Sequence, residues 1–476
     1  MQRDVLCLEV DPRDSHCSEP VKLSPILGPE IDRLIRCPET LFDLARTYGS
    51  PLHIVFPEVL KANVEAFRAV LHRHEISHEI FYGAKVNKSP SLVRAAVEAN
   101  IGVDVSSVYE MRDALRAGID PARLCATGPA KARVFHMALV ANHALISVDS
   151  VEELRDLEAV AREIGPERPA RVLLRYRPSD AASHRFGMTE DELLLCLDRI
   201  AHSPDVFLFE GFHFHLSGYR YESRAATVRE LVRFVDAARA MGLEPKLIDI
   251  GGGMPVRYVE HAHYEAFLKA QDERHYRTGK RPASFYPYGG PIGPDQWLDR
   301  LLASPALHGR SIAAYLKANA LTLAIEPGRS LADQTAMSVF RIARVKSMAA
   351  GEAVIFVEGS SFSACETWFG SEFLVDPLLI SAQREPGVGV TATRSWIAGH
   401  SCLDEDVITN RWLSFARTPR PGDLLVYANT AGYQMDLLEN EFHRHPVPRR
   451  ICAKYGVDNG MTISTDDRME NWNDFE

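Results

Sequence analysis

Short apolar runs alternate with amphipathic stretches from about residue 80 to residue 326. The stretches SLVRAAVEA, YEMRDALRAG and DSVEELRDLEAVAREIG space their apolar positions as helices do, and the last opens on Asp149-Ser150, a candidate N-cap. Eight runs are short and apolar enough to predict strands. They are Phe81–Lys85, Gly102–Val105, Leu124–Thr127, Leu145–Val148, Arg171–Tyr176, Val206–Leu216, Leu247–Ile250 and Leu321–Ile325.

Strands that alternate with helices predict an α/β fold with a parallel sheet. Eight such units favour a (β/α)8 TIM barrel. A doubly wound sheet is the alternative, but the first strand is not followed by GxGxxG. After residue 331 the helical spacing ends. The runs Met337–Lys346, Ala353–Val357, Thr391–Ala398 and Leu424–Ala428 predict a C-terminal all-β domain.

These patterns give a provisional domain map. We expect an N-terminal arm over 1–38, the barrel over 39–330, the β domain over 331–455 and an acidic tail over 456–476. The stretch 272–320 is longer than one crossover requires and contains PASFYPYGGPIGP. We interpret it as an inserted loop, a kind of segment that is often functional.

Composition narrows the class of protein. The 476 residues are 46% apolar and 25% charged, and no run approaches the roughly 20 apolar residues that span a bilayer. The N-terminus lacks the pattern of a secretory signal, so we expect a cytoplasmic protein. A net charge of −10 argues against nucleic acid as a partner. None of the eight cysteines has CxxC spacing, so we expect no metal.

Polar residues gather at the carboxyl ends of the predicted strands, where barrel enzymes hold their active sites. They are Lys85, Asp104, Ser107, Glu110, Arg175, His213, His215, Ser217, Gly218, Asp249, Gly251, Gly252, Gly253, Glu326, Gly328 and Arg329. Each has an ordinary structural explanation as a solvated strand end, a packed core residue or a tight turn. Alternatively, three glycine N–H groups and an arginine form a phosphate site. The combination is less probable by chance than any member alone.

The order of these pieces resembles the fold-type III decarboxylases that depend on pyridoxal 5′-phosphate (PLP), such as diaminopimelate, ornithine and arginine decarboxylases. The resemblance covers roughly residues 40–450. It rests on FYGAKVNKSP, GVDVSSVYEM, ATGPAK, ISVDSVEEL, HRFGM, FHFHLSG, LIDIGGGMP, IEPGRSL, GHSCLDEDVI and GDLLVYANTAGYQMD. It implies an alanine-racemase-like TIM barrel, an all-β domain and PLP as the cofactor.

The resemblance also implies roles for individual residues. Lys85 matches the Schiff-base lysine, His215 the histidine stacked on the cofactor ring, and Glu326 the acidic partner of the pyridine nitrogen. Ser217, Gly218, Gly251, Gly252, Gly253, Gly328, Arg329 and Tyr433 match the phosphate site. Asp104, Glu110 and Arg175 match supporting polar residues. Cys402 matches a proton-delivering cysteine that reaches the site of the other subunit in a homodimer. Exchange of the Lys85 imine for a substrate imine works best with a lowered lysine pKa.

The sequence departs from the family pattern at three points, of which the first two leave the substrate open and the third concerns the phosphate contact. Leu403 stands where an acidic residue usually reads the distal amine, although Asp404 follows it. The stretch GSSFSACETWFG lacks the arginine that grips a distal carboxylate, and Ser217-Gly218 replaces Gly-Ser. Cys402, Asp404, Trp368 and Tyr433 are the candidate substrate-binding residues. We expect a diamino or modified amino acid from a biosynthetic pathway.

Two alternatives remain at this stage. One is a PLP-dependent amino-acid racemase, which usually has Arg rather than an acid at the pyridine nitrogen. The other is a catalytically inactive relative that acts by binding a partner protein, against which the joint retention of Lys85, Glu326, Arg329 and Cys402 argues.

Overall fold

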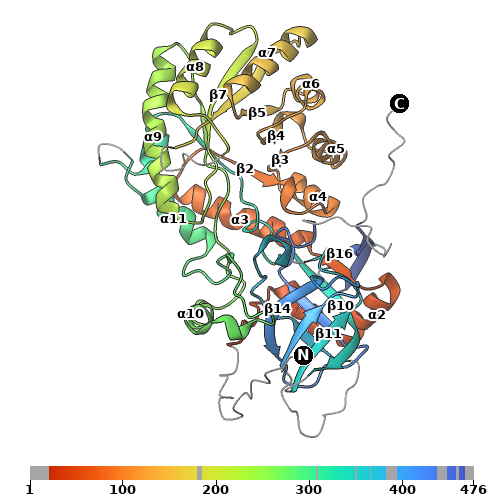
Figure 1. Ribbon diagram of the computed structural model, residues 1–476. Helices are drawn as coiled ribbons and strands as arrows, with labels where there is room; N and C mark the ends of the chain where they lie inside the picture. Colours follow the sequence, from red (N-terminus) through yellow and green to blue (C-terminus); the bar gives the residue numbers. More distant parts are fainter. Residues whose placement is uncertain are drawn as a thin grey trace, which may run out of the picture.

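The computed structural model describes residues 21–178, 185–306, 309–348, 351–364, 366–381, 394–436, 447–456 and 460–466. These residues form an α/β barrel and a mostly β domain, which lie one above the other in Figure 1. Within them, no helix combines the length and apolar character that crossing a membrane requires.

Eight parallel strands close the barrel, and each corresponds to one of the eight predicted runs. In order around the barrel they are β2 (His78–Gly83), β3 (Gly102–Val105), β4 (Leu124–Ala126), β5 (Leu145–Val148), β6 (Ala170–Arg175), β7 (Phe207–His213), β8 (Leu247–Asp249) and β9 (Thr322–Ile325). β9 pairs with β2 in parallel, with His78 beside Leu323, and this closes the circle. The predicted barrel is confirmed.

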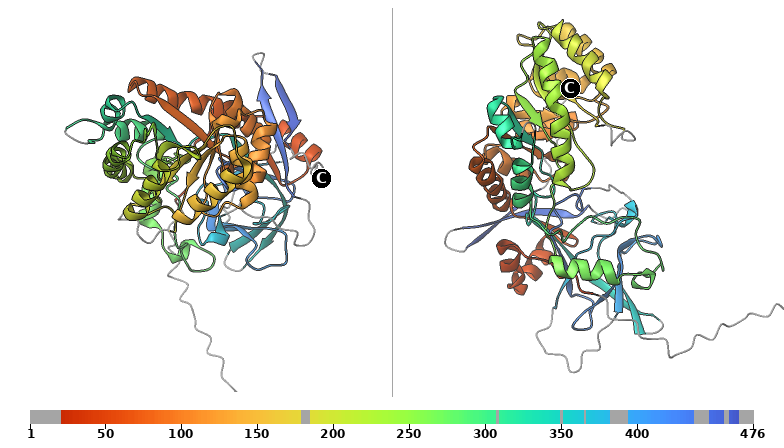
Figure 2. Two further views of the ribbon diagram at one scale, coloured as in Figure 1. Left: turned by 90° about the horizontal axis from the view of Figure 1, so that it is seen from above. Right: turned by 90° about the vertical axis from the view of Figure 1, so that its left-hand side faces the viewer.

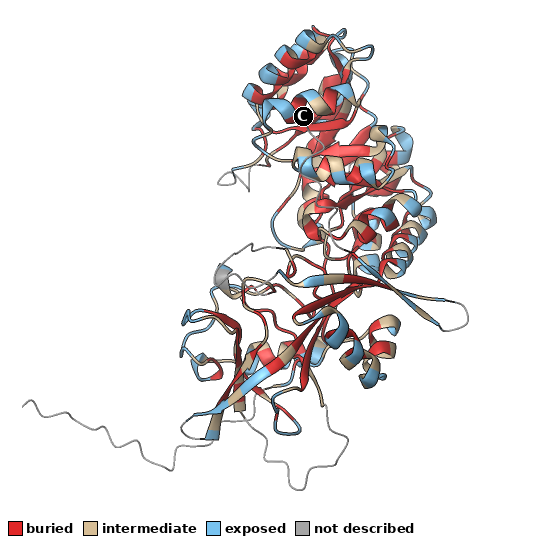
Figure 3. Ribbon diagram, turned by 90° about the vertical axis from the view of Figure 1, so that its right-hand side faces the viewer, coloured by how far each residue is buried: buried red, intermediate tan, exposed pale blue. Residues whose placement is uncertain are grey.

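Helices cover the outside of the barrel, with their apolar faces on the strands and their polar faces outward (Figure 3). They are α3 (Pro57–Arg73), α4 (Pro90–Glu98), α5 (Val108–Arg116), α6 (Arg133–Ala141), α7 (Val151–Ile164), α8 (Glu190–Ala201), α9 (Tyr221–Ala240), α11 (Pro294–Ala303) and α12 (Ile312–Ala318). Ser150 caps α7 by accepting a hydrogen bond from the Glu153 N–H, as the sequence predicted. Figure 2, seen from above, shows the ring that they form.

The interpretation of 272–320 as one inserted loop is wrong for its second half. That half contains α11 and α12, and α11 packs against α3 and α9. Trp297, Leu298 and Leu301 are buried there and belong to the main barrel core. Their spacing in PDQWLDRLLA is helical, but the neighbouring Pro- and Gly-rich segment obscured it.

The second domain is built on a nine-stranded sheet. Its strands are β1 (Leu52–Val55), β10 (Ala336–Ser347), β11 (Glu352–Val357), β12 (Leu378–Ile380), β13 (Arg394–Ala398), β14 (Val407–Ser414), β15 (Leu424–Ala428), β16 (Arg449–Tyr455) and β17 (Met461–Thr465). α10 (His261–Ala270) also packs on this domain, since Tyr264 and Phe267 share its apolar cluster with Phe373 and Tyr427.

Both ends of the described chain join this second domain. β1 pairs with β10 and β16, so the range 39–330 predicted for the barrel includes a strand of the other sheet. The helices α1 (Pro29–Ile35) and α2 (Pro38–Tyr48) pack on the same strands. At the other end, β17 lies in the range predicted as a tail and pairs with β16. Both differences arise because these short strands complete a sheet through pairings distant in sequence.

The second domain holds the segment that follows Lys85. The hydrogen bonds run from Tyr433 N to Val86 O (2.9 Å), Asn87 Nδ2 to Ala431 O (3.0 Å), Lys88 N to Asp436 Oδ2 (2.8 Å) and Ser91 N to Asp466 Oδ1 (2.9 Å). Bonds to buried carboxylates are stronger than neutral ones, so this contact fixes where the barrel presents Lys85.

Candidate active site

The barrel interior has an apolar layer below a polar one. Phe81, Cys125, Leu145, Leu173, Leu247 and Ala324 form a buried cluster inside the strands. Side chains two positions apart on a strand face the same way. Two positions after five of these residues come Thr127, Ser147, Arg175, Asp249 and Glu326, all buried. The alternation therefore places a ring of polar side chains at the carboxyl end of the barrel, where barrel active sites lie.

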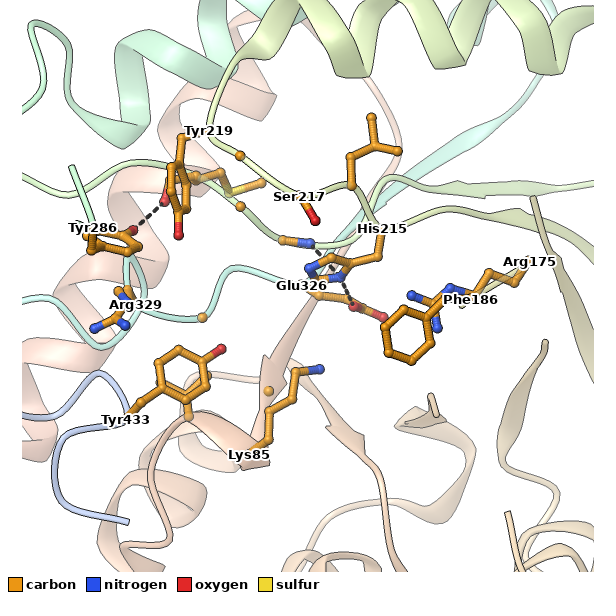
Figure 4. A pocket seen from close by; sticks show the side chains of 18 of the residues that line it. Lys85, Arg175, Phe186, His215, Ser217, Tyr219, Tyr286, Glu326, Arg329 and Tyr433 are labelled. Carbon is orange, nitrogen blue, oxygen red and sulfur yellow. Dashed lines mark hydrogen bonds and ion pairs between the residues drawn. The ribbon is translucent and has the colours of Figure 1, made fainter. Parts of the chain in front are cut away.

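A cavity of about 700 Å³ opens above this ring. Figure 4 shows Lys85 pointing into it beside His215 and Glu326, with Arg329 and Tyr433 at its other side. The predicted site residues that line it are Lys85, Arg175, His215, Ser217, Gly218, Gly252, Gly253, Glu326, Gly328, Arg329 and Tyr433. Segments far apart in sequence thus meet as the motif order suggested.

Lys85 lies in a single 3-10 turn (Ala84–Val86) just after β2, and 35% of its side-chain area is exposed to the cavity. Its Nζ donates to Asp104 Oδ2 at 2.7 Å, and the Thr127 hydroxyl donates to Asp104 Oδ1 at 2.7 Å. Burial acts to lower the pKa of Lys85, but the Asp104 and Glu326 carboxylates outweigh it and raise that pKa above its ordinary value. From the sequence we expected a lowered pKa for Lys85, because imine exchange works best with one. The structure instead gives a raised pKa.

Glu326 stands at the end of β9 between two imidazoles. Its Oε2 is 3.4 Å from His215 Nδ1, and its Oε1 is 3.8 Å from His213 Nε2. Burial acts to raise the pKa of Glu326, but the two histidines and Lys85 hold that pKa below its usual range. Oε1 is buried and has no hydrogen-bond partner. The site therefore holds a charged carboxylate between the two imidazoles.

The turn that follows β8 places Asp249 next to the Glu326 carboxylate. Asp249 Oδ1 accepts from Gly251 N at 2.8 Å, and burial together with the Glu326 charge raises the pKa of Asp249. The neighbouring Glu326 carboxylate therefore disfavours the charged form of Asp249. Gly252 N lies 3.3 Å from His215 Nδ1, so the imidazole packs against the glycine turn.

The glycine turn is packed too tightly for any side chain. A Cβ on Gly252 would lie 2.6 Å from the Glu326 carbonyl oxygen. Gly253 has φ +83°, and a Cβ there would overlap the Arg224 guanidinium. Gly218, on the facing loop, has φ +74° with open space where its side chain would be. Backbone from both loops therefore approaches the cavity directly, as binding of a phosphate group requires.

Both predicted arginines at the cavity are already paired with acids. Arg175 donates to Asp149 Oδ1 at 2.9 Å. Arg329 donates to the Gly432 carbonyl oxygen at 2.6 Å and to Glu366 Oε1 at 3.0 Å. Glu366 belongs to the stretch GSSFSACETWFG, which lacks the arginine that the family pattern has there. The guanidinium of Arg329 also lies 4.2 Å from the Tyr286 ring centre and 4.9 Å from that of Tyr433.

Several predicted residues lie away from this cavity. Cys402 is exposed, and Cys402 and Asp404 are absent from the cavity lining of the described chain. The Trp368 side chain lies outside the described residues. Glu110 pairs with Lys88 at 2.8 Å rather than with Lys85.

Sequence reasoning missed several residues that shape the site. Ser147 contacts His213 Nδ1 at 2.6 Å, and Thr127 holds Asp104. Tyr286 also lines the cavity, and it lies in the insertion that the sequence had marked as a possible functional loop. The spacing of two from an inward apolar residue would have found Ser147 and Thr127. Tyr286 comes from the segment 272–320, whose first half therefore reaches the site. Nothing in the sequence marked Arg224 as a buried residue of the site, because arginines in amphipathic helices usually lie on the solvent-exposed face.

The same residues also resemble a metal site. Among the described residues, His213, His215 and Glu326 bring three possible ligand atoms within 4.8 Å of one another. The Lys85 ammonium acts on the same Glu326 carboxylate. A metal ion there would be repelled by that ammonium, so the arrangement suits a group that reacts with the amine.

Asp104→Asn is expected to lower the pKa of Lys85, because it removes the carboxylate that most favours the charged amine. The neutral amine is the form that attacks an aldehyde. The pH midpoint for imine formation with pyridoxal should fall by about one unit or more, measured by absorbance. Thr127→Val, which keeps the carboxylate, should shift the midpoint less. An unchanged or higher midpoint in Asp104→Asn would contradict this electrostatic assignment.

The sequence is similar to a family of pyridoxal-dependent enzymes and to two other proteins. The family model described as "Pyridoxal-dependent decarboxylase, pyridoxal binding domain" matches residues 59–280. An uncharacterised protein of Sinorhizobium fredii, y4yA, is 55% identical over 433 residues, covering 90% of this chain and 94% of that protein. The diaminopimelate decarboxylase of Vibrio cholerae is 29% identical over 255 residues, covering 49% of this chain and 60% of that enzyme.

A solved diaminopimelate decarboxylase has a similar fold. The crystal structure of diaminopimelate decarboxylase from M. jannaschii in complex with L-lysine gives a TM-score of 0.69 at 18% identity, covering 90% of this chain and 91% of that one. The barrel, the second β domain and the matched pyridoxal-binding region lead to one assignment. The chain belongs to the fold-type III PLP-dependent decarboxylase family.

Proposed function

We propose that the protein is a PLP-dependent amino-acid decarboxylase in which Lys85 binds the cofactor. The observation that carries the proposal is the charged Glu326 carboxylate, which lines the cavity with Lys85 and His215. An acidic group there holds a proton on a pyridine nitrogen. When bound, PLP accepts the electron pair that departing CO₂ leaves at the α-carbon, and a protonated ring accepts it best.

The residues around the cavity fit this cofactor. The Lys85 amine projects into the space, the His215 imidazole lies against the glycine turn, and the backbone at Gly252 and Gly253 is bare. These groups would hold the aldehyde, one ring face and the phosphate, in that order. Tyr433, from the second domain, lines the same space.

The chain's own residues then have distinct tasks. Asp104 and Thr127 fix the Lys85 amine, Glu326 keeps a proton at the ring nitrogen, and the aromatic rings of Phe186, Tyr219, Tyr286 and Tyr433 limit water in the cavity. Lys85 and Cys402 are the candidates to return a proton to the α-carbon.

The proposal is tested by incubating the purified full chain and PLP with a panel of carboxyl-labelled amino acids. Trapped labelled CO₂ from at least one amino acid, with the matching amine as product, is the expected result. Inversion of configuration without CO₂ would indicate a racemase, and no reaction with any amino acid would favour the binding-protein alternative. Relatives include enzymes named for diaminopimelate, so diamino acids head the panel.

We further propose that two copies share each site. Cys402 lies outside the cavity of its own chain, although its motif, GHSCLDED, carries the family resemblance. A second copy that presents its Cys402 loop to this cavity would complete the site.

Mixing the Lys85→Ala and Cys402→Ala variants is expected to restore decarboxylation. Each variant alone is inactive or strongly impaired, but a mixed dimer has one site with both native residues. After subunit exchange, about a quarter of the wild-type rate is expected, since about half of the dimers are mixed and each carries one complete site. No gain over the separate variants, despite mixed dimers detected by native mass spectrometry, would contradict shared sites.

A further inference from the structure

Arg224 is a fully buried cation directly behind the two loops of the cavity. It lies in the first turns of α9, which Figure 1 shows beside the barrel. Its NH2 group donates to the Leu216 carbonyl oxygen at 2.7 Å and makes a longer contact of 3.4 Å with that of Gly252. Its NH1 group makes similar 3.4 Å contacts with the carbonyls of Ser217 and Arg220.

One guanidinium therefore joins the loop after β7 to the glycine turn after β8. These are the loops that carry Ser217, Gly218, Gly252 and Gly253 to the cavity wall. A Cβ at Gly253 would overlap the Arg224 NH2 group, so the turn closes onto the guanidinium. By holding carbonyl oxygens of both loops, the guanidinium fixes how their backbone faces the cavity.

The positive charge of Arg224 has no counter-ion in the part of the chain that the structure describes. All its hydrogen bonds go to backbone carbonyls. Burial lowers its pKa to about 10, and Tyr219 is the one neighbour that opposes this. It also lies near the N-terminus of a 20-residue helix, where a cation is unfavourable. An anion in the cavity would relieve both effects.

Arg224 and Arg329 differ in what balances their charge. Arg329 is the residue that the sequence motif assigned to phosphate, yet it is bonded to Glu366 at 3.0 Å. Arg224 is the more deeply buried of the two and pairs with no carboxylate within the described ranges. The altered Ser217-Gly218 order occurs on the loop that Arg224 holds.

We propose that Arg224 is a positioning residue for the phosphate end of the cofactor site, an inference that rests on the proposed PLP function. It fixes the two loops through their carbonyls and supplies positive charge to the phosphate without touching it. Its effect should therefore depend on the phosphate and not on the aldehyde or the ring.

The test compares two ligands on the full chain after cofactor removal. PLP and pyridoxal share the aldehyde and the ring, but pyridoxal lacks the phosphate. Arg224→Met should weaken PLP binding by about 10- to 100-fold, as expected for loss of a charged hydrogen-bonding group. Pyridoxal binding should change by less than about threefold. Imine absorbance and fluorescence titrations measure both dissociation constants.

Matched variants separate positioning from a purely structural role. Arg224→Lys keeps the charge and should bind PLP within about fivefold of wild type, while Arg233→Met removes an exposed arginine of the same helix and should change neither constant. Arg224→Gln carries the same expectation as Arg224→Met and serves if that variant does not fold. Equal losses for PLP and pyridoxal, or no loss for either, would overturn the assignment. A wild-type chain that does not prefer PLP to pyridoxal would instead contradict the proposed function itself.

Discussion

Lys85→Ala is expected to abolish amino-acid decarboxylation, with a loss on the order of 10⁴-fold or more. Lys85 is the amine that projects into the 700 Å³ cavity, where Asp104 holds it. The alanine variant should also lose the visible imine absorbance, although its phosphate loops remain. Spectra and CO₂ release on the same preparations measure both effects.

A surface lysine provides the control for this variant. Lys317, on α12, is partly exposed and pairs with Glu75, so Lys317→Ala should retain both the absorbance and the rate. A Lys85→Ala protein that still decarboxylates at more than about a tenth of the wild-type rate would contradict the role of this lysine.

Glu326→Gln is expected to reduce kcat by about 10²- to 10³-fold, in the range seen when one group that stabilises transition-state charge is removed. Glutamine has nearly the same shape, but it cannot hold a proton on a ring nitrogen. Because the histidines and Lys85 hold the pKa of Glu326 low, the wild-type carboxyl stays charged throughout the neutral range. The deficit should therefore be the same from about pH 6 to pH 9.

The cofactor content of this variant distinguishes chemistry from binding. Glu326→Gln should still contain about one PLP per chain, measured after denaturation, since Lys85 and the glycine turn are unchanged. A kcat within about fivefold of wild type would show that the acid is not required. A protein without PLP would place the role of Glu326 in binding instead.

The sequence predicted the barrel well because the signal is local. Each of the eight strands is a short apolar run, and each was identified within a few residues. The ring of polar side chains at the carboxyl end of the barrel was also predictable in part, because Arg175, Asp249 and Glu326 stand at the ends of their predicted strands. Ser147 and Thr127 were missed because a small hydroxyl residue next to a strand end is common, and its importance depends on which way it faces.

Long-range pairings account for the differences in the domain map. Nothing in LHIV indicates that β1 inserts between β10 and β16 of another domain. Likewise, the motif EPGR suggested a phosphate contact for Arg329, but the motif does not reveal that Glu366, 37 positions later, binds that guanidinium. Arg224 became visible as a candidate only when the partners of its guanidinium were known.

Borohydride reduction followed by peptide mapping determines whether Lys85 is the residue that carries the cofactor. The purified protein, loaded with PLP and reduced, should contain a single major peptide with an added phosphopyridoxyl group. That group should lie on Lys85, and the Lys85→Ala variant should lack it. A stable label on another lysine, or no label in a protein that still releases CO₂ from an amino acid, would contradict the account.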